Sequence, residues 1–221
     1  MRKPVVDYRG FRLSKIHEPQ FAHLKLLWGW VGYLVMFVLT ERLIPAQRCR
    51  PVHMWLDDRI PFCEIFVIPY VFWYFLILIS LGYFLLYNVD GFKRLQIALI
   101  TTQVLAVLIY ILFPSRQDLR PVVFPRDNVL TRLVALLYSV DTNTGVCPSM
   151  HVAFSIVMAS AWLKEKAVSR GWKIFVAAAA VLICLSTMFI KQHSAVDFFA
   201  ALPVCLAAEY VAYGRPCRRK R

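Results

Sequence analysis

The chain has 221 residues, of which 59% are hydrophobic and only 18% are charged. Its mean hydropathy of +0.57 is too high for a soluble globular domain and predicts an integral membrane protein. The formal net charge of +13 is not accompanied by any aromatic–basic recognition motif. We therefore expect no nucleic-acid partner, and we assign the excess of Lys and Arg to helix ends that face anionic lipid.

Six apolar segments follow one another along the chain, each close to the about 20 residues that span a bilayer as a helix. They run over Leu24–Thr40, Ile65–Tyr87, Leu95–Phe113, Ser149–Leu163, Ile174–Ile190 and His193–Tyr213. The sequence thus predicts an all-α bundle of six transmembrane helices over residues 24–213. A basic N-terminal tail, residues 1–23, and a basic C-terminal tail, residues 214–221, flank this membrane domain.

The third loop contains a further amphipathic stretch, "PRDNVLTRLVALLYSVD". Asp127 or Asn128 is expected to cap a helix there. One apolar stripe at helical spacing follows, formed by Val129, Leu130, Leu133, Val134, Leu137 and Val140. The stretch is too polar to span a membrane, so we predict a helix lying in the interface; a loop helix packed on the bundle is an equally good interpretation.

Basic residues are distributed unevenly between the loops, which predicts the orientation. They gather in the N-terminal tail, at Lys93 and Arg94, in the loop around residues 164–173 and in the C-terminal tail. Six crossings place all four regions on one side, which the positive-inside rule assigns to the cytoplasm. We expect a multi-pass protein of the cell membrane with both termini cytoplasmic. The loops 41–64 and 114–148 and the turn at Lys191 then lie outside.

The stretch "CPSMHVAFS" opens the fourth apolar segment and predicts a phosphate-binding helix start. Ser149 is a good N-cap, and the free N–H groups of Met150 and His151 would point out of the membrane. A helix N-terminus of this kind binds phosphate oxygens. His151 would stand beside the bound group, where it can give or take a proton.

A second histidine and a carboxylate open the sixth segment, in "KQHSAVDFFA". His193 and Asp197 are four residues apart and share a helix face. A carboxylate inside an apolar run is costly and requires a partner or a function. An imidazole oriented by Asp197 would be an activated nucleophile or base. Glu209, near the inner end of the same segment, is expected to reach the interface by snorkelling.

Cationic side chains on the same outer face are expected to complete the site. Arg116 and Arg120, in "FPSRQDLRP", and Lys191 are candidates to bind phosphate oxygens. No carboxylate, thiolate and histidine spacing suits a metal, so we expect neither a metal nor another cofactor. Cys147 lacks the following arginine that a cysteine-based phosphatase needs, and we interpret it as a packed neighbour. Together these groups predict metal-independent phosphoryl transfer.

These motifs resemble those of the type 2 phosphatidic acid phosphatase superfamily, whose signatures are KxxxxxxRP, PSGH and SRxxxxxHxxxD. The second is present as "PSMH", the third as "STMFIKQHSAVD", and the first only in part, ending at Arg120 and Pro121. The resemblance implies that His193 forms a phosphohistidine, that Asp197 orients it and that His151 protonates the leaving oxygen. It also implies that Ser149, the nearby backbone and Arg120 hold the phosphate.

Three positions depart from the family signatures. Phe113 stands in place of the first motif's lysine, Met150 in place of the second motif's glycine, and Thr187 in place of the third motif's arginine. Met150 is compatible with the motif if it is helical. Arg116 and Lys191 are candidates to supply the missing positive charge. The third motif is similar to a branch that includes inositol phosphorylceramide synthases, in which an alcohol accepts the phosphoryl group.

The leading hypothesis is therefore a membrane phosphatase that hydrolyses a lipid phosphate at the outer leaflet. Phosphatidic acid, phosphatidylglycerol phosphate and polyprenyl diphosphate all fit as substrates. The alternative is a lipid phosphotransferase of the inositol phosphorylceramide synthase type, with the same residues and an alcohol acceptor. A non-catalytic lipid-binding or scaffold protein is a third interpretation, against which the complete His–His–Asp set argues. Membrane lipids are the other expected partners, and the sequence predicts no oligomeric state.

Overall fold

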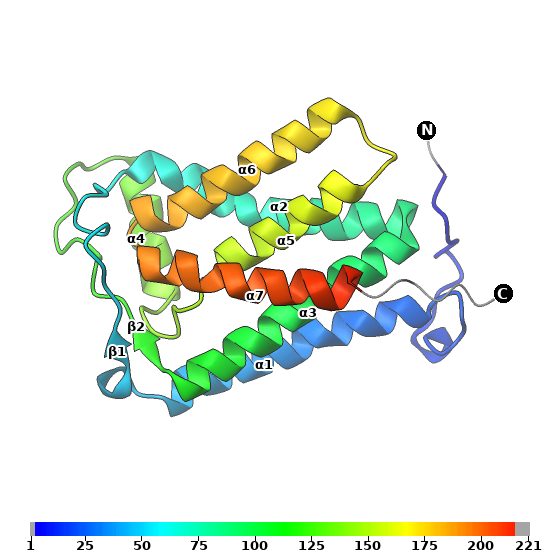
Figure 1. Cartoon of the computed structure of the whole chain (residues 1–221), viewed down its shortest axis with the longest axis horizontal. Helices are drawn as coiled ribbons and strands as arrows, with labels where there is room; N and C mark the ends of the chain where they lie inside the picture. The colour runs from blue at the N-terminus through cyan, green and yellow to red at the C-terminus, as the bar shows by residue number, and fades with distance from the viewer. Residues whose placement is uncertain (1–2, 215–221) are drawn as a thin grey trace.

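Seven α-helices form in the part of the chain that the structure, a computed structural model, describes: residues 3–214 (Figure 1). They are α1 (Trp28–Leu43), α2 (Val67–Tyr87), α3 (Val89–Leu112), α4 (Val129–Val140), α5 (Met150–Lys164), α6 (Arg170–Phe189) and α7 (Ala195–Tyr213). Short 3-10 helices occupy Leu13–Lys15, Ala22–Leu27, Ala46–Arg48 and Glu64–Phe66. The expected all-α class is confirmed, and most of the predicted basic C-terminal tail lies outside the described residues.

Five helical stretches are long and apolar enough to cross a membrane. Two of the 3-10 helices extend α1 and α2, so the stretches are Ala22–Leu43, Glu64–Tyr87, Val89–Leu112, Arg170–Phe189 and Ala195–Tyr213. The fourth predicted span forms α5, which has 15 residues. At about 1.5 Å per residue it is about 22 Å long, shorter than a hydrocarbon core of about 30 Å. By length and composition, the chain is a multi-pass membrane protein.

Capping side chains place three helix starts differently from the prediction. α3 begins at Val89 because Oδ1 of Asn88 accepts a hydrogen bond from the backbone N–H of Gly91 at 2.8 Å. Lys93 and Arg94 therefore lie in its first turns and not in a connection. Likewise, Ser169 starts α6 at Arg170. Ser194 starts α7 at Ala195, which leaves His193 just outside the helix.

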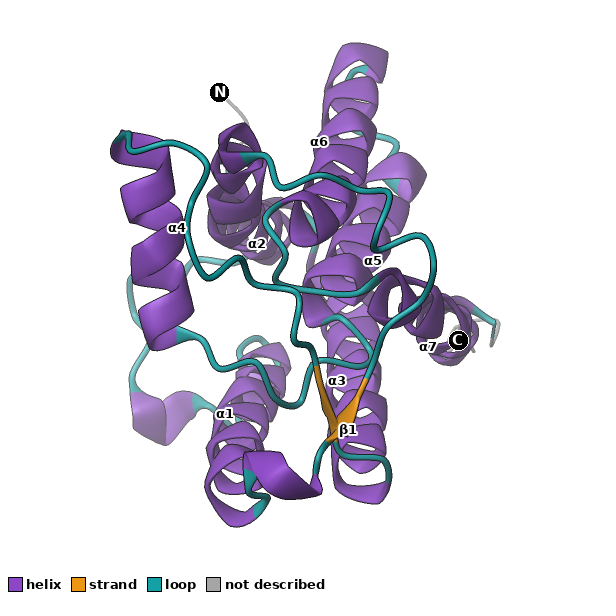
Figure 2. Ribbon diagram, turned by 90° about the vertical axis from the view of Figure 1, so that its left-hand side faces the viewer, coloured by secondary structure: helices purple, strands orange, loops and turns teal. Residues whose placement is uncertain are grey.

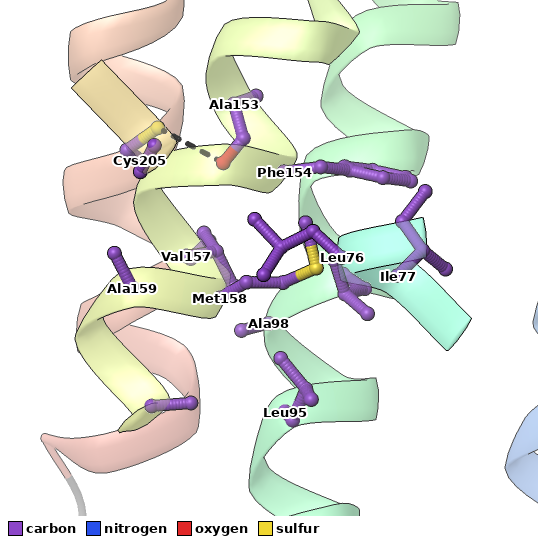
Figure 3. Packing of buried hydrophobic residues seen from close by; sticks show 14 of the residues in the cluster. Leu76, Ile77, Leu95, Ala98, Ala153, Phe154, Val157, Met158, Ala159 and Cys205 are labelled. Carbon is purple, nitrogen blue, oxygen red and sulfur yellow. Dashed lines mark hydrogen bonds between the residues drawn. The ribbon is translucent and has the colours of Figure 1, made fainter. Parts of the chain in front are cut away.

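α5 packs in the centre of the bundle against α3, α6 and α7. Val152, Ala153 and Met158 are completely buried, and Figure 3 shows Val157 and Met158 facing Leu95 and Ala98 of α3. Truncating a side chain such as Met158 to alanine would cost about 2–5 kcal/mol, the usual range for a core cavity. This packing fixes the position of the helix whose first turn carries His151.

α4 packs against α2 and the 3-10 helix before it, and it confirms the predicted cap. Asn128 and Thr131 form a reciprocal capping box. The predicted stripe is only partly buried. Val134 is completely buried, and Leu130, Leu133 and Leu137 pack beside it on α2 and the preceding turn. Val129 and Val140, at the two ends of the helix, are each 78% exposed and lie outside this contact.

The two ends of the bundle differ in what they carry. The start of α1 and the end of α7 lie at one end, whereas α4 and the strands β1 (Arg50–Pro51) and β2 (Ser115–Arg116) lie at the other. β1 and β2 pair in parallel, Arg50 with Ser115. Figure 2 shows the long loops crossing this strand-bearing end. The segment before α1 is folded onto the opposite end, where the N–H of Val5 donates to the carbonyl of Leu86 at 2.8 Å.

Candidate functional site

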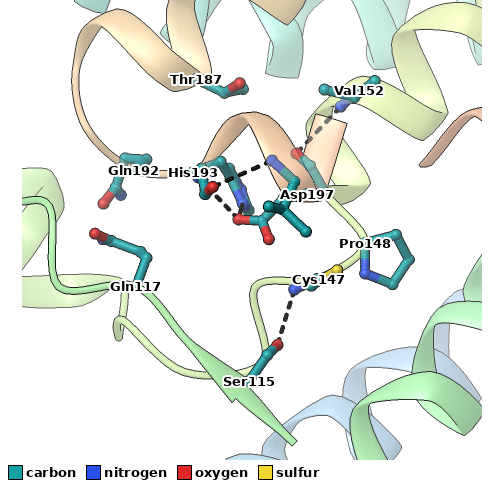
Figure 4. Close-up of polar contacts among 12 residues, drawn as sticks. Ser115, Gln117, Cys147, Pro148, Val152, Thr187, Gln192, His193 and Asp197 are labelled. Atoms are coloured by element: carbon teal, nitrogen blue, oxygen red, sulfur yellow. Dashed lines mark hydrogen bonds and ion pairs between the residues drawn. The ribbon is translucent and has the colours of Figure 1, made fainter. Parts of the chain in front are cut away.

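The start of α7 presents an oriented imidazole. Oδ2 of Asp197 accepts a hydrogen bond from the backbone N–H of Ser194 at 3.0 Å and lies 3.2 Å from Nδ1 of His193 (Figure 4). An ionised carboxylate can only accept, so this contact favours the tautomer with the proton on Nδ1 and the lone pair on Nε2. Asp197 is completely buried, and His193 is 9% exposed. The predicted pair is therefore brought together, with Nε2 as the free nitrogen.

The turn before α7 holds His193 in place through its backbone. The carbonyl of Thr187 accepts from the N–H groups of both Gln192 and His193, each at 3.0 Å. Lys191 has a φ of +55°, a conformation that requires support in a residue other than glycine. Its ammonium supplies that support by donating to the carbonyls of Asp57 and Ile60, at 2.8 and 2.5 Å. Lys191 thus fastens the turn to the loop between α1 and α2.

Asp57, which the sequence did not single out, caps α7 from that loop. Its Oδ1 accepts from the backbone N–H of Ala195 at 2.7 Å, and its Oδ2 from Oγ of Ser194 at 2.6 Å. Oδ2 also accepts from the N–H of Met54 at 2.8 Å. The side chain is 3% exposed. No local signal shows that Asp57 rather than the neighbouring exposed Asp58 caps α7, because Ser194 and Ala195 lie far away in the sequence.

The start of α5 is tied directly to α7. Ser149 is the N-cap, as predicted, and its Oγ accepts from the N–H of Val152 at 3.4 Å. Its own N–H donates to the carbonyl of Asp197 at 3.1 Å. The hydroxyl of Tyr110 donates to the carbonyl of Pro148 at 2.7 Å. Met150 is the first helical residue, so the motif tolerates a side chain there without strain.

His151 lies between aromatic rings and close to His193. Its ring centroid is 4.2 Å from those of Tyr70 and Trp73, and 5.9 Å from that of His193. Among the described residues, its buried Nε2 has no hydrogen-bond partner. The two imidazoles therefore lie close together and line the same cavity.

A cavity of about 280 Å³ opens beside the two histidines. Met150, His151, Gln192 and His193 form one wall, and α1, α2, α3 and the loop 140–146 form the others. The aromatic residues of its lining are Tyr33, Phe37, Trp73, Tyr74 and Tyr110. Asp141 is the acidic residue of the lining, and no Lys or Arg of the described chain contributes to it. The three predicted phosphate-binding cations thus lie outside the cavity lining.

Arg120 is near the site but is occupied by other acceptors. Its Nη2 donates to the carbonyls of Asp141 and Thr142, both at 2.9 Å, and to Oε1 of Gln192 at 2.7 Å. Its guanidinium lies 4.5 Å from the ring centroid of Tyr138. Burial lowers the pKa of Arg120 from its usual value. In this arrangement Arg120 joins the loop after α4 to the turn that carries His193.

The other candidates for positive charge are also engaged elsewhere. Arg116 donates to Oδ2 of Asp118 at 3.0 Å and to the carbonyl of Ala46 at 3.2 Å. Thr187, which replaces the family's arginine, is completely buried and donates to the carbonyl of Cys184 at 2.8 Å. Phe113, which replaces the lysine, is 64% exposed at the end of α3.

Cys147 sits beside Asp197 and is chemically quiet. Burial, reinforced by the neighbouring Asp197 carboxylate, raises the pKa of Cys147 to about 12. The thiol therefore stays protonated near neutral pH, which supports its interpretation as a packed neighbour. Over residues 3–214, no group of three or more His, Cys, Asp or Glu side chains is arranged to hold a metal ion.

Three comparisons with known proteins gave no match to this chain, neither a protein-family model, nor a curated protein, nor a solved structure.

Proposed function

We propose that this protein is a metal-independent membrane phosphatase that hydrolyses a lipid phosphate through a phosphohistidine at His193. One observation carries the proposal: the His193–Asp197 pair leaves Nε2 free beside a cavity that also receives His151 and the start of α5. An imidazole oriented by a carboxylate, opposite a second imidazole, matches the roles of nucleophile and general acid.

In the proposed first step, Nε2 of His193 bonds to phosphorus as the phosphorus–oxygen bond to the lipid breaks. Asp197 stabilises the positive charge that develops on the His193 ring. His151 gives a proton to the lipid oxygen, which leaves as an alcohol. In the second step a water molecule loses a proton to His151 and bonds to phosphorus. The phosphorus–nitrogen bond then breaks, and phosphate and the free His193 are regenerated.

Backbone groups are proposed to hold the phosphate, since the cationic side chains are engaged elsewhere. The N–H groups of Met150 and His151 belong to the first turn of α5, where a helix N-terminus attracts anions. Arg120 contributes its positive charge from behind Gln192. Arg116 and Lys191 act through the loops that they fasten, and Ser149 acts by capping α5.

The proposed topology has six crossings, which are the five long helical stretches and the shorter α5. α5 is central and flanked by protein, so neighbouring helices and loops cover the ends that its length does not reach. The N- and C-termini lie in the cytoplasm, and the site faces outward from the cell membrane. α4, with its exposed Val129 and Val140, rests in the outer interface.

Transfer to an alcohol, as in inositol phosphorylceramide synthases, is the second candidate function. The mostly aromatic and aliphatic cavity lining favours it, because such walls admit a lipid alcohol more readily than bulk water. Product analysis of the purified protein distinguishes the two. Free phosphate released from a lipid phosphate without added alcohol supports hydrolysis, and an absolute requirement for an alcohol supports transfer. If the purified protein forms neither product from any lipid phosphate that is tested, the proposal is overturned.

A further inference from the structure

The cavity beside His151 has a lining that suits a positive charge better than a negative one. Aromatic rings from three helices surround it, and Asp141 contributes a carboxylate. That carboxylate accepts hydrogen bonds from two neutral donors, Tyr70 Oη at 3.4 Å and Gln192 Nε2 at 3.1 Å. No ion pair joins it to a cationic side chain within residues 3–214. Arg120 binds its backbone carbonyl instead.

Four of the rings belong to α1 and α2. Tyr33 and Phe37 lie one helical turn apart on α1, with ring centroids 5.9 Å from each other. Trp73 and Tyr74 are adjacent on α2, with centroids at 5.0 Å. Asp141 lines the same cavity as Tyr33 and Tyr74. Aromatic faces that converge near a carboxylate are the usual recognition element for ammonium groups.

Charge balance in the cavity points the same way. A phosphate monoester alone would bring a second negative group beside Asp141, and Arg120, whose positive charge acts on Asp141, lies outside the cavity lining. A substrate that carries its own ammonium would offset the carboxylate and keep its phosphate beside the start of α5. Trp73 contacts the His151 ring at 4.2 Å, so the aromatic group is within a head group's length of the phosphoryl site.

We propose that this cavity binds an ammonium group of the substrate, and that the substrate class is a lipid phosphate with an ammonium a few bonds from phosphorus. The proposal rests on the proposed function for the meaning of substrate. It names the residues of an ammonium subsite as Tyr33, Phe37, Trp73, Tyr74 and Asp141. The ammonium takes no part in bond making; it fixes the head group and completes the charge balance.

The cavity size and its mouth fit a head group whose lipid chains stay outside. A volume of about 280 Å³ is just below the about 300–1,000 Å³ of pockets that enclose a whole drug-sized ligand. Leu34 of α1 and Tyr74 of α2 line the cavity yet are 57% and 49% exposed. α1 packs mainly on α3, and α2 on α3 and α6. The mouth therefore opens between α1 and α2, where acyl chains can remain in the bilayer.

Binding is tested first without turnover, in the full-length His193→Ala variant in lipid nanodiscs. Dihexanoyl phosphatidylcholine and dihexanoyl phosphatidylglycerol share chains and a phosphodiester but differ in the ammonium, and titration calorimetry compares them below micellar concentrations. We expect the choline lipid to bind about ten-fold tighter, and Asp141→Asn to remove that preference. Tyr74→Leu should weaken choline-lipid binding, and Tyr74→Phe should not. Asp127→Asn, which changes an exposed carboxylate just before α4, is the matched control.

Turnover by the unmodified protein then locates the ammonium. One arm compares phosphatidylcholine, phosphatidylglycerol and phosphatidic acid with equal chains, which tests an ammonium on the head-group side. The other compares a long-chain amino-alcohol phosphate with its N-acetylated form, which tests an ammonium on the lipid side. A preference for the cationic member of either arm supports the proposal and names the side.

The possible failures are distinguishable. Equal binding of the two dihexanoyl lipids, or tighter binding of the phosphatidylglycerol, would overturn the ammonium subsite even if phosphatidic acid is hydrolysed. Selective choline-lipid binding that Asp141→Asn abolishes, together with no turnover of any lipid, would support the subsite and overturn the proposed enzymatic function.

Discussion

Replacing Asp57 by alanine should loosen the start of α7 and misplace His193. The carboxylate accepts three hydrogen bonds, from Ala195 N, Ser194 Oγ and Met54 N, at 2.7, 2.6 and 2.8 Å. Two of these satisfy the N-terminal turn of the helix that carries Asp197. The site is buried, with Asp57 3% exposed, so water cannot readily replace the lost acceptor.

The expected magnitude follows from these contacts. Loss of an N-cap acceptor costs about 0.5–2 kcal/mol, and a buried donor left unsatisfied costs about 1–3 kcal/mol. Together they predict a loss of about 3 kcal/mol. In a domain of this size that corresponds to an unfolding temperature lower by about 6–12 °C. Turnover should fall about 10²-fold, because a displacement of about 1 Å at a catalytic group can cost that much.

The assay is thermal unfolding of the purified protein in one detergent, followed by initial rates on the substrate identified by product analysis. Asp57→Asn keeps one acceptor oxygen, so its unfolding temperature should lie between those of Asp57→Ala and the unmodified protein. Asp58→Asn is the matched control, because Asp58 is exposed and pairs with His53. The reasoning is refuted if Asp57→Ala unfolds at the temperature of the Asp58→Asn control and retains its turnover.

Four further predictions test the site and the topology. His193→Ala should be inactive on every substrate. His151→Ala should reduce turnover of a lipid phosphate about 10²–10⁴-fold yet still release a burst of nitrophenol from an aryl phosphate. A phosphohistidine labelled at His151 would reverse the two roles. Turnover should be indifferent to EDTA, and a loss that magnesium restores would contradict the metal-independent mechanism. Tags at either terminus should resist labelling from outside right-side-out vesicles, and their labelling would invert the proposed orientation. Burial raises the pKa of Asp141 against the opposing effects of His193 and Arg120. In the His193→Ala variant, the affinity for dihexanoyl phosphatidylcholine should therefore decrease as the pH is lowered, at a higher pH than an ordinary aspartate would give. The same decrease in a variant that also carries Asp141→Asn would assign it to another group.

Local signals in the sequence were sufficient for most of the helices and for the paired catalytic candidates. Apolar runs predict the long helices because a chain in lipid must satisfy its backbone internally. Ser149 and Asn128 start α5 and α4 as predicted, since a cap needs only the next three residues. His193 and Asp197 meet because the helix start fixes their spacing. The confirmed features thus depend on contacts within one or two turns.

The starts of α3, α6 and α7 were predicted less well for a related reason. Their charged or polar first turns, such as Lys93 and Arg94 in α3, resemble loop residues in hydropathy although a cap includes them in the helix. α5 shows the opposite limit. Its hydropathy resembles that of a spanning helix. The helix nevertheless has only 15 residues, and α3, α6 and α7 bury it.

The cationic side chains show what only the tertiary structure decided. Arg120 and Lys191 carry a charge that any sequence-based argument assigns to phosphate, yet both donate to backbone carbonyls of distant loops. Asp57 lies 137 residues before Ser194, and no spacing rule connects them. Long-range partners depend on how loops cross the end of the bundle. The sequence alone therefore determined which groups are candidates for chemistry, and the fold determined which of them line the cavity and which stabilise the loops around it.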